Sequence, residues 1–242
     1  MTPPVFVAED LTGDRLVLTG PEGHHAATVR RVKVGEPVDV VDGHGTRVSC
    51  TVTAVERDIV RLLVLHRTTE PAPSPRIVLV QALAKGERGE LAVELATEVG
   101  VDEVVPWVAA RCIVKWEGER GGKALRRWRS AAREAGKQSR RSWLPEVLEQ
   151  HTTEQVVHRA RAAAAAIVLH ESGTVPLAGL TLPTDGDVLL VVGPEGGIRD
   201  EEIAALEAVG AQTVRLGSSV LRTSTAGAAA ASVVSAMTPR WR

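Results

Sequence analysis

Short apolar runs, separated by turn residues, fill the first 66 residues of the chain. The runs are rich in residues that favour β-strands, and turn signals bound each of them, which is typical of short strands. The predicted strands are Arg15–Leu18, Pro37–Val41, Arg47–Val55 and Ile59–Leu65, with a hairpin turn at Asp42–Gly45. His24–Val34 lies among them as a short basic helix or turn. Several short strands at this spacing predict a small β-barrel.

From Ile77 onward the pattern changes, because unbroken apolar runs alternate with helical segments. The predicted strands are Ile77–Leu83, Val104–Val108, Ala166–His170, Val188–Val192 and Thr213–Leu216. The predicted helices are Glu90–Val99, Gly121–Ser139, Thr152–Ala164, the segment from Asp200 to Gly210, and Ser224–Met237. Strands separated by helices of this length indicate βαβ units and a mostly parallel sheet.

The segment from Arg67 to Arg76 is the clearest domain boundary. Three prolines in five residues, Pro71, Pro73 and Pro75, keep it extended and prevent either flanking element from continuing. We therefore expect two domains, residues 1–70 and residues 76–242.

Composition narrows the class of protein. A hydrophobic content of 44% and a charged content of 24% over 242 residues are typical of a soluble globular protein. We expect a cytoplasmic protein with no membrane association, because no apolar run reaches the length of a membrane span. Cys50 and Cys112 have no metal-binding spacing, which predicts reduced cysteines and no bound metal.

Charge is unevenly distributed in a chain whose net charge is −1. Of the 29 basic residues 24 are arginine, the side chain best suited to bidentate phosphate contacts, although a GC-rich genome gives the same bias. The predicted helix 121–139 and the two residues after it carry eight cations and one acid, Glu134. Five of them follow three- and four-residue steps and should share one face: Arg126, Arg129, Arg133, Lys137 and Arg140. An RNA backbone would compensate such a face, and a merely solvated face is the alternative.

Two glycine-marked turns follow neighbouring strands in the last fifty residues. The sequence GPEGG follows the strand Val188–Val192, and LGSSVLRTSTAG follows Thr213–Arg215. Glycine lets the backbone come close to a ligand, so we expect a small, flat ligand held by main-chain amides and carbonyls. Neither standard phosphate-binding signature, GxGxxG or GxxxxGK[ST], is present.

These turns resemble the SPOUT superfamily of S-adenosylmethionine-dependent RNA methyltransferases, and most of all the bacterial 16S ribosomal RNA uridine-N3 methyltransferases. Further resemblance lies in KGER at 85–88, ELATEVGV at 94–101, Arg111-Cys112, EAGKQSRRSWLP at 134–145 and LHE at 169–171. Two positions depart from the family pattern, since Lys137 and Ser224 each stand where the family usually has Glu.

The resemblance implies an α/β SPOUT-type domain with a C-terminal trefoil knot, preceded by a PUA-like RNA-binding barrel, and a homodimer acting on 16S rRNA or the 30S subunit. It implies methylation at N3 of a uridine, number 1498 of the decoding region. The cofactor would be S-adenosyl-L-methionine, held by Leu169, His170, Glu171, Gly193, Pro194, Glu195, Gly196, Gly197, Ile198, Leu216, Gly217, Val220, Leu221, Arg222, Thr223, Thr225 and Ala226.

Catalysis requires stabilisation of the charge that develops on the uridine when N3 loses its proton. Arg222 is the first choice for this role, and a phosphate clamp or a structural salt bridge is the alternative. Glu195 is the second catalytic candidate, because it is the carboxylate inside the glycine turn, and a helix cap is its alternative. The predicted RNA contacts are His25, Arg30, Arg31, Lys33, Lys85, Arg88, Arg111, Arg126, Arg129, Arg133 and Arg140.

Two other functions stay open. A SPOUT ribose 2′-O-methyltransferase acting on another RNA would share the cofactor turns, but the PUA-like segment and the LRT motif argue against it. A non-catalytic ribosome-assembly protein would keep the fold, and the absence of Glu at position 224 is the feature that favours it.

Overall fold

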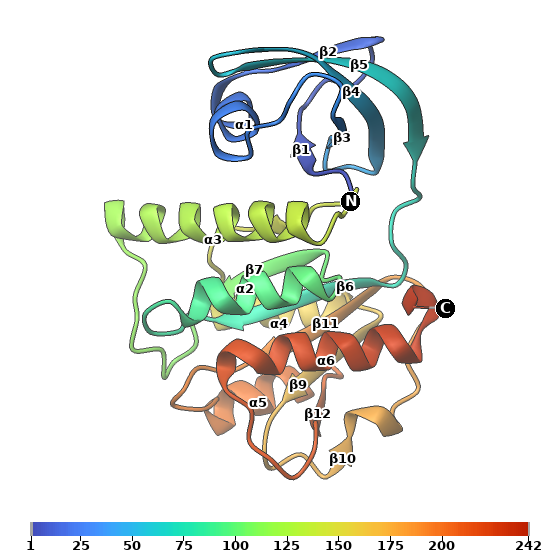
Figure 1. Cartoon of the computed structure of the whole chain (residues 1–242). Coiled ribbons are helices and arrows are strands. Elements are labelled where there is room, and N and C mark those ends of the chain that lie inside the picture. Colours follow the sequence, from blue (N-terminus) through green and yellow to red (C-terminus); the bar gives the residue numbers. More distant parts are fainter. Residues whose placement is uncertain (1, 242) are drawn as a thin grey trace. The chain divides into compact units, whose positions relative to one another are not determined.

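The computed structural model describes residues 2–241 (Figure 1). The chain forms two compact units, which divide between Ala72 and Pro73, inside the proline-rich segment. The first unit contains the chain up to Ala72 and also Gly136–Leu144, a segment that the sequence had placed in the second domain. The second unit contains Pro73–Ala135 and the chain from Pro145 onward.

The first unit is a five-stranded sheet with the order β1-β3-β4-β5-β2. Its strands are β1 (Val5–Val7), β2 (Arg15–Leu18), β3 (Pro37–Val41), β4 (Thr46–Glu56) and β5 (Ile59–Thr69). All neighbours are antiparallel except β1 and β3. The four predicted strands are confirmed, but β1 is too short to have shown an apolar period. The basic segment at 24–34 is helical only in part, as α1 (Gly20–His24) and the π-helical turn η1 (His25–Val29).

Residues 136–144 complete this unit through contacts with the β3–β4 hairpin. Gly45 has φ +101°, and a Cβ added there would lie 2.7 Å from the indole of Trp143, so the two segments pack at backbone distance. Leu144 packs against a small buried cluster of Val5, Val7 and Val41. These contacts join residues 98 to 139 positions apart in the chain, which no local pattern encodes.

The second unit is a seven-stranded, wholly parallel sheet with the order β10-β12-β9-β11-β6-β7-β8. Its strands are β6 (Arg76–Ala82), β7 (Glu103–Trp107), β8 (Glu146–Val147), β9 (Ala165–Leu169), β10 (Val175–Pro176), β11 (Asp187–Val192) and β12 (Gln212–Arg215). Its helices are α2 (Arg88–Glu98), α3 (Gly118–Gln138), α4 (Thr153–Ala162), α5 (Asp200–Glu207) and α6 (Thr223–Met237), with 3₁₀ turns η2 (Leu177–Gly179) and η3 (Pro239–Trp241). The predicted βαβ pattern is confirmed.

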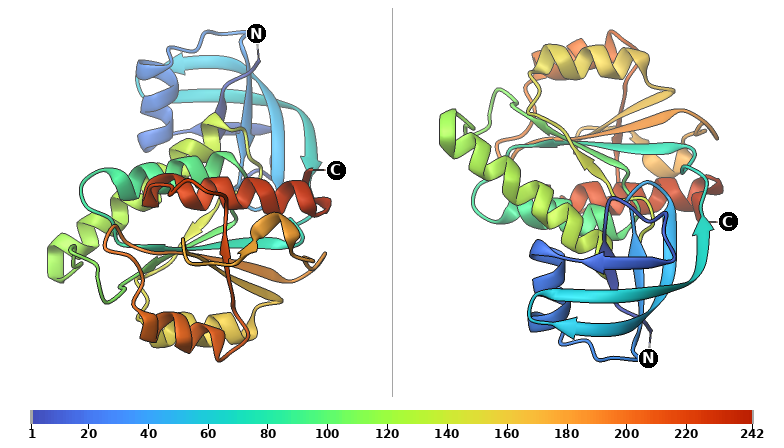
Figure 2. Two further views of the ribbon diagram at one scale, coloured as in Figure 1. Left: turned by 90° about the horizontal axis from the view of Figure 1, so that it is seen from below. Right: turned by 90° about the horizontal axis from the view of Figure 1, so that it is seen from above.

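Helices cover both faces of this sheet, which explains why its central strands are apolar without interruption (Figure 2). In β6, Ile77 and Leu79 face the core shared with α2, α3 and α6, whereas Val78 and Val80 face α4 and α5. Both faces of β6 and β11 are therefore buried in the core. The carboxyl ends of the parallel strands are left to carry the loops that form the site.

Helix α6 lies closer to β6 than ordinary side chains would permit. A Cβ added to Gly227 would be 2.8 Å from Cδ1 of Leu79, and Ala230 and Ala231 next to it are fully buried. The small residues of 226–231 thus permit the close packing of α6 on the sheet. The trefoil knot implied by the family resemblance stays a prediction.

Candidate functional site

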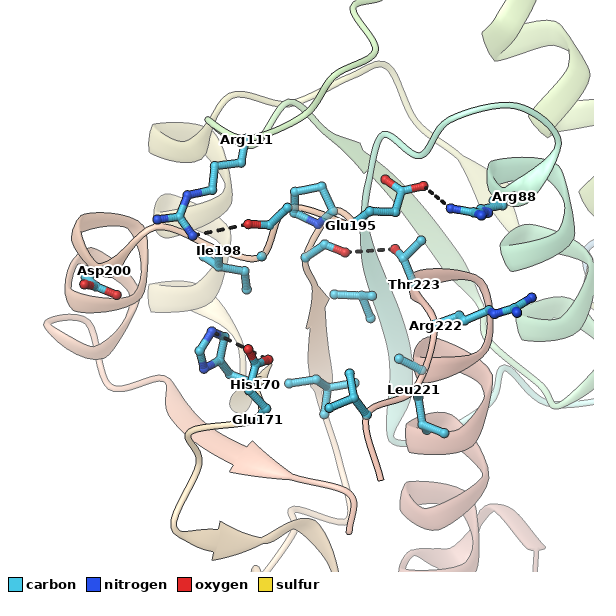
Figure 3. A pocket seen from close by; sticks show the side chains of 18 residues that line it. Arg88, Arg111, His170, Glu171, Glu195, Ile198, Asp200, Leu221, Arg222 and Thr223 are labelled. Atoms are coloured by element: carbon cyan, nitrogen blue, oxygen red, sulfur yellow. Dashed lines mark hydrogen bonds and ion pairs between the residues drawn. The ribbon is translucent and has the colours of Figure 1, made fainter. Parts of the chain in front are cut away.

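Three loops of the second unit surround a cavity of about 570 Å³ (Figure 3). The first loop follows β11, the second follows β9, and the third leads from β12 into α6. Parallel strands bring their carboxyl ends to one edge of a sheet, where open α/β sheets commonly bind ligands. The lining residues are Arg88, Arg111, Leu169, His170, Glu171, Val192, Gly193, Pro194, Glu195, Gly196, Gly197, Ile198, Asp200, Val220, Leu221, Arg222, Thr223 and Ala226.

Nearly all of the residues predicted to hold a cofactor line this cavity. The exceptions are Leu216, Gly217 and Thr225. Leu216 and Gly217 line an adjoining hollow of about 180 Å³ that shares Val220 and Leu221 with the main cavity. The hydroxyl of Thr225 donates instead to the carbonyl of Arg222 at 3.2 Å, inside the first turn of α6.

The Gly193–Gly197 turn has the backbone geometry that its glycines suggest. Gly197 has φ +76°, and its N–H donates to the carbonyl of Pro194 at 2.9 Å, which closes the turn. A Cβ at Gly193 would lie 2.6 Å from Cγ1 of Ile198, so a side chain there would force the turn open. The main chain is therefore the surface that this loop offers to a ligand.

The carboxylate of Glu195 is fixed by the loop that precedes α2. Its Oε1 accepts hydrogen bonds from the backbone N–H of Lys85 and from Nη1 of Arg88, both at 3.2 Å. Burial raises the pKa of Glu195, but hydrogen bonds from its own backbone N–H, from Lys85 and from Arg88, and the charge of Arg88, outweigh burial, so the pKa lies below 4.5. A carboxylate held in this way is a weak proton acceptor.

The alternative that Glu195 caps the next helix is wrong. The backbone N–H of Arg199, the N-cap residue of α5, donates to Oε2 of Glu202 at 3.2 Å. Glu202 is 6% exposed and also accepts from the N–H of Ala110 and the hydroxyl of Thr153. It thereby ties the start of α5 to the loop that carries Arg111.

Arg222 is the N-cap residue of α6 and is exposed at the cavity. Within residues 2–241 its guanidinium has no ion-pair partner, so the structural salt bridge considered above has no counterpart here. Figure 3 shows the Arg222 side chain on the same side of the cavity as Arg88, away from His170. A free cation beside a ligand pocket is suited to hold developing negative charge.

Comparison with known proteins decides the family. The RNA methyltransferase domain family matches residues 70–235, and the RNA methyltransferase PUA domain family matches residues 18–65. Ribosomal RNA small subunit methyltransferase E of Mycobacterium tuberculosis is 47% identical over 95% of this chain and 89% of its own length. The Bacillus subtilis protein of that name is 31% identical over 91% and 90%. The chain belongs to the ribosomal RNA small subunit methyltransferase E family.

Solved structures agree with this assignment. A ribosomal RNA small subunit methyltransferase E from Neisseria gonorrhoeae, bound to S-adenosyl methionine, has a TM-score of 0.87 at 26% identity, covering 98% of each chain. A Legionella pneumophila protein in complex with bound SAM has the same TM-score at 29% identity, covering 98% of this chain and 99% of its own. The predicted α/β SPOUT-type fold with a separate PUA-like N-terminal sheet is confirmed for this member of the methyltransferase E family.

Two arginines that the sequence assigned to RNA also line the cavity of this methyltransferase family member. Arg88 binds Glu195, and Nη1 of Arg111 donates to the carbonyl of Gly196 at 3.2 Å. Lys85 contributes its backbone N–H to Glu195 and keeps its side chain exposed. Val192 and Asp200 were not predicted, although the end of an apolar run and the start of a helix could have indicated them.

His170 lies at the end of β9, where the sequence placed it, and its side chain is 15% exposed. The Ser172 hydroxyl lies 2.7 Å from its Nδ1, and Nε2 is 4.0 Å from a carboxylate oxygen of Glu171. His170 is therefore a partly buried member of the cavity wall, held in place by its own loop.

The basic helix differs from the prediction in one important way. Lys137 does not share an exposed face with the arginines, because it is 5% exposed and its Nζ lies 3.2 Å from Oε1 of Glu22. Arg127 pairs with Glu90 at 2.9 Å, and Arg129 pairs with Glu149 at 3.0 Å. Acids from other elements therefore compensate Arg127, Arg129 and Lys137, and the expectation that an RNA backbone contacts this helix stays a prediction.

The remaining predicted RNA contacts lie at the surface or near it. Arg126, Arg133 and Arg140 are exposed, and Arg140 has φ +58°, just beyond the end of α3. In the first unit, Arg31 and Lys33 are exposed, Arg30 pairs with Glu36 at 3.2 Å, and the His25 ring packs edge-on against Phe6. These positions leave the predicted RNA contacts as proposals.

Residues 2–241 contain no group of three or more His, Cys, Asp or Glu side chains placed to hold a metal ion. None of the helices in that range combines the length and apolar character needed to cross a bilayer.

Proposed function

We propose that this protein transfers the methyl group of S-adenosylmethionine to N3 of a uridine in 16S rRNA. One observation carries the proposal: the GPEGG turn and the LRT turn, which follow different strands of the sheet, line one cavity in a chain that belongs to the methyltransferase E family. The uridine at position 1498 is the target that the family resemblance implies.

The cavity wall suits the proposed cofactor. Apolar side chains of Leu169, Ile198 and Leu221 provide surface for the adenosine, and the backbone of the glycine turn provides hydrogen-bonding groups. The wall carries three carboxylates and three guanidinium groups, so its formal charges balance. When bound, S-adenosylmethionine supplies a methyl group already activated by its sulfonium, so the protein needs to align the nucleophile and manage charge.

Arg222 is the proposed charge-stabilising residue. Arginine stays protonated in proteins, so it acts on the uridine anion as a donor and a cation, not as a base. Its guanidinium lacks an ion-pair partner among residues 2–241 and is therefore available to the carbonyl oxygens that flank N3. Glu195 instead holds Arg88 and the loop before α2 against the cofactor turn.

The non-catalytic alternative loses its main support. It rested on Ser224, which stands where the family usually has Glu. Ser224 is 4% exposed, lies within α6 and does not line the cavity, so this position contributes no side chain to the cavity wall. A catalytic function does not depend on a carboxylate at this position.

Binding of the RNA substrate is assigned to the exposed cations of both units: Arg31 and Lys33 in the first, and Arg126 and Arg133 in the second. The match of the first unit to an RNA methyltransferase PUA domain supports this. Assembled 30S subunits or 16S rRNA in the cytoplasm would be the substrate, and the free state of Cys50 and Cys112 suits a reducing compartment.

A homodimer belongs to the same proposal, by family resemblance. The apolar helix α6 is no additional support for a dimer, because Ala230, Ala231 and Val234 pack into the core of their own chain. Sedimentation should give a mass near twice 25.7 kDa, and an active monomer at micromolar concentration would contradict the dimer.

The test is transfer of label from methyl-labelled S-adenosylmethionine to RNA. The protein should label 30S subunits that lack the modification, and the Arg222→Ala variant should bind the cofactor with nearly unchanged affinity but transfer the methyl group at a strongly reduced rate. Cofactor binding without any transfer to RNA would favour the assembly protein.

A further inference from the structure

A buried chain of hydrogen bonds joins the end of strand β6 to two of the cavity loops. Nε2 of Gln81 donates to Oγ1 of Thr223 at 2.9 Å, and Oγ1 of Thr223 donates to the carbonyl of Gly193 at 2.8 Å. Gln81 is fully buried and Thr223 is 8% exposed. The chain thus runs from the centre of the sheet to the first residue of the glycine turn.

The side-chain amide of Gln81 fixes the direction of these hydrogen bonds. Nε2 of Gln81 also donates to the carbonyl of Ala82 at 3.2 Å, so the amide nitrogen, and not the oxygen, must face both groups. The Thr223 hydroxyl accepts from Gln81 and has one hydrogen left, which it gives to Gly193. Gln81 therefore determines which way the hydroxyl points.

This arrangement leaves a defect in the core. Oε1 of Gln81 is buried and has no hydrogen-bond partner within residues 2–241. A buried acceptor without a donor destabilises the folded state, and an apolar side chain of the same size would avoid that loss. A glutamine here is therefore poorly explained by packing alone.

We propose that Gln81 is a positioning residue of the cofactor site: through the Thr223 hydroxyl it holds the glycine turn and the first turn of α6 at a fixed separation. Thr223 directly follows Arg222, so the same contact sets the place of the charge-stabilising arginine. The register between β6 and β11 supports the assignment, because Gln81 pairs with Val192, the residue just before Gly193. This inference rests on the proposed function, since it assigns a role within the same cavity.

Four variants of the full chain test it, with affinity for S-adenosylmethionine measured by calorimetry and stability by thermal melting. Gln81→Met keeps the volume and removes the amide, and Thr223→Val keeps the shape and removes the hydroxyl. Each should weaken cofactor binding about tenfold, as expected for a lost hydrogen bond within a binding site. Thr223→Ser keeps the hydroxyl and should bind nearly as wild type. Gln81→Met should melt at the wild-type temperature or above it.

Ser235 provides the matched control. Its Oγ is the other buried side-chain atom without a partner within residues 2–241, but it lies twelve residues along α6 from Thr223, about 18 Å at 1.5 Å per residue. Ser235→Ala should leave cofactor affinity unchanged. If Gln81 acts on the site only through the Thr223 hydroxyl, the double variant Gln81→Met/Thr223→Val should bind S-adenosylmethionine no more weakly than the weaker-binding single variant.

The outcomes separate this inference from the proposed function. A wild-type protein that does not bind S-adenosylmethionine contradicts the proposed function itself. Wild-type affinity in Gln81→Met, or a double variant in which the two losses simply add, overturns the positioning role alone. Should Gln81→Met fold poorly, the comparison of Thr223→Val with Thr223→Ser still decides, because equal affinities in that pair would overturn the role of the hydroxyl.

Discussion

The ammonium of Lys137 lies 3.2 Å from the carboxylate of Glu22, and the Lys137 side chain is buried, with 4% of its surface exposed, whereas that of Glu22 is partly buried, with 13% exposed. Removing the ammonium takes a cation away from a largely buried carboxylate. Lys137→Met should therefore lower the free energy of unfolding of the first unit by about 3 kcal/mol or more.

Denaturant unfolding followed by circular dichroism measures this loss. Arg126→Met removes an exposed cation from the same helix and should change stability by less than about 0.5 kcal/mol. The double variant Lys137→Met/Glu22→Met should recover part of the loss, because it removes both charges. Equal effects of Lys137→Met and Arg126→Met would contradict the buried pair.

The hydrogen bonds that Glu195 accepts from Lys85 and Arg88 should contribute to the free energy of unfolding in a pH-dependent way. Its folded pKa is depressed below 4.5, so the stabilisation is present above that value and is lost as the pH falls through the lower, folded pKa. Glu195→Gln should therefore melt below wild type at neutral pH, and the two curves should converge in acid. The Arg88 side chain is 52% exposed, so the difference should stay below about 1 kcal/mol.

The same variant tests catalysis. If Glu195 holds the loop before α2 and is not the proton acceptor, the pH dependence of kcat should have the same shape in Glu195→Gln as in wild type. Loss of a basic limb from that pH profile would show that Glu195 accepts the proton after all.

A side chain at position 196 should distort the cavity and weaken cofactor binding. A Cβ there would lie 3.3 Å from both Cβ and the carbonyl oxygen of Arg111, so the branched side chain of Gly196→Val must displace the Arg111 loop. Cofactor binding should fall by two orders of magnitude or more, by about 3 kcal/mol, with little loss of stability. Gly122→Val in α3, where a Cβ meets its nearest atom at 3.5 Å, is the control and should bind normally. Wild-type affinity in Gly196→Val would place the cofactor elsewhere.

The first unit should contribute phosphate contacts through Arg31 and Lys33. Arg30 is a poorer choice for charge reversal, since its pairing with Glu36 means that a glutamate there would also repel its neighbour. Arg31→Glu/Lys33→Glu should weaken binding to 30S subunits and lower the slope of log affinity against log salt by about one per lost contact. Arg15→Glu reverses an exposed arginine on β2 and should leave the slope unchanged. An unaltered slope in the double variant would make the first unit a structural domain.

Local pattern was enough to predict most of the second unit. The apolar runs of β6 and β11 are buried on both faces, and Gly100 and Gly210 end α2 and α5 with φ of +101° and +97°, as their places in the sequence suggested. The cavity could be predicted because its loops carry recognisable motifs at strand ends. Such features depend on neighbours in sequence, so a single chain reveals them.

Other features depend on partners far away in the chain. Lys137 follows the helical spacing of the exposed arginines, and only the position of Glu22 makes it a buried residue. Gln81 looks like an isolated polar residue in an apolar strand until Thr223, 142 positions later, is placed beside it. The grouping of Gly136–Leu144 with the first unit has the same origin, since Trp143 and Leu144 pack against segments near residues 5–45.

The identity of the methylated nucleoside tests the central claim most directly. 30S subunits lacking the modification would be incubated with the protein and S-adenosylmethionine, and the 16S rRNA would be digested to nucleosides and separated by mass spectrometry against standards. We predict 3-methyluridine, formed by wild type and strongly reduced in Gly196→Val. A 2′-O-methylated nucleoside, or no methylated product from a protein that binds the cofactor, would contradict the proposed function.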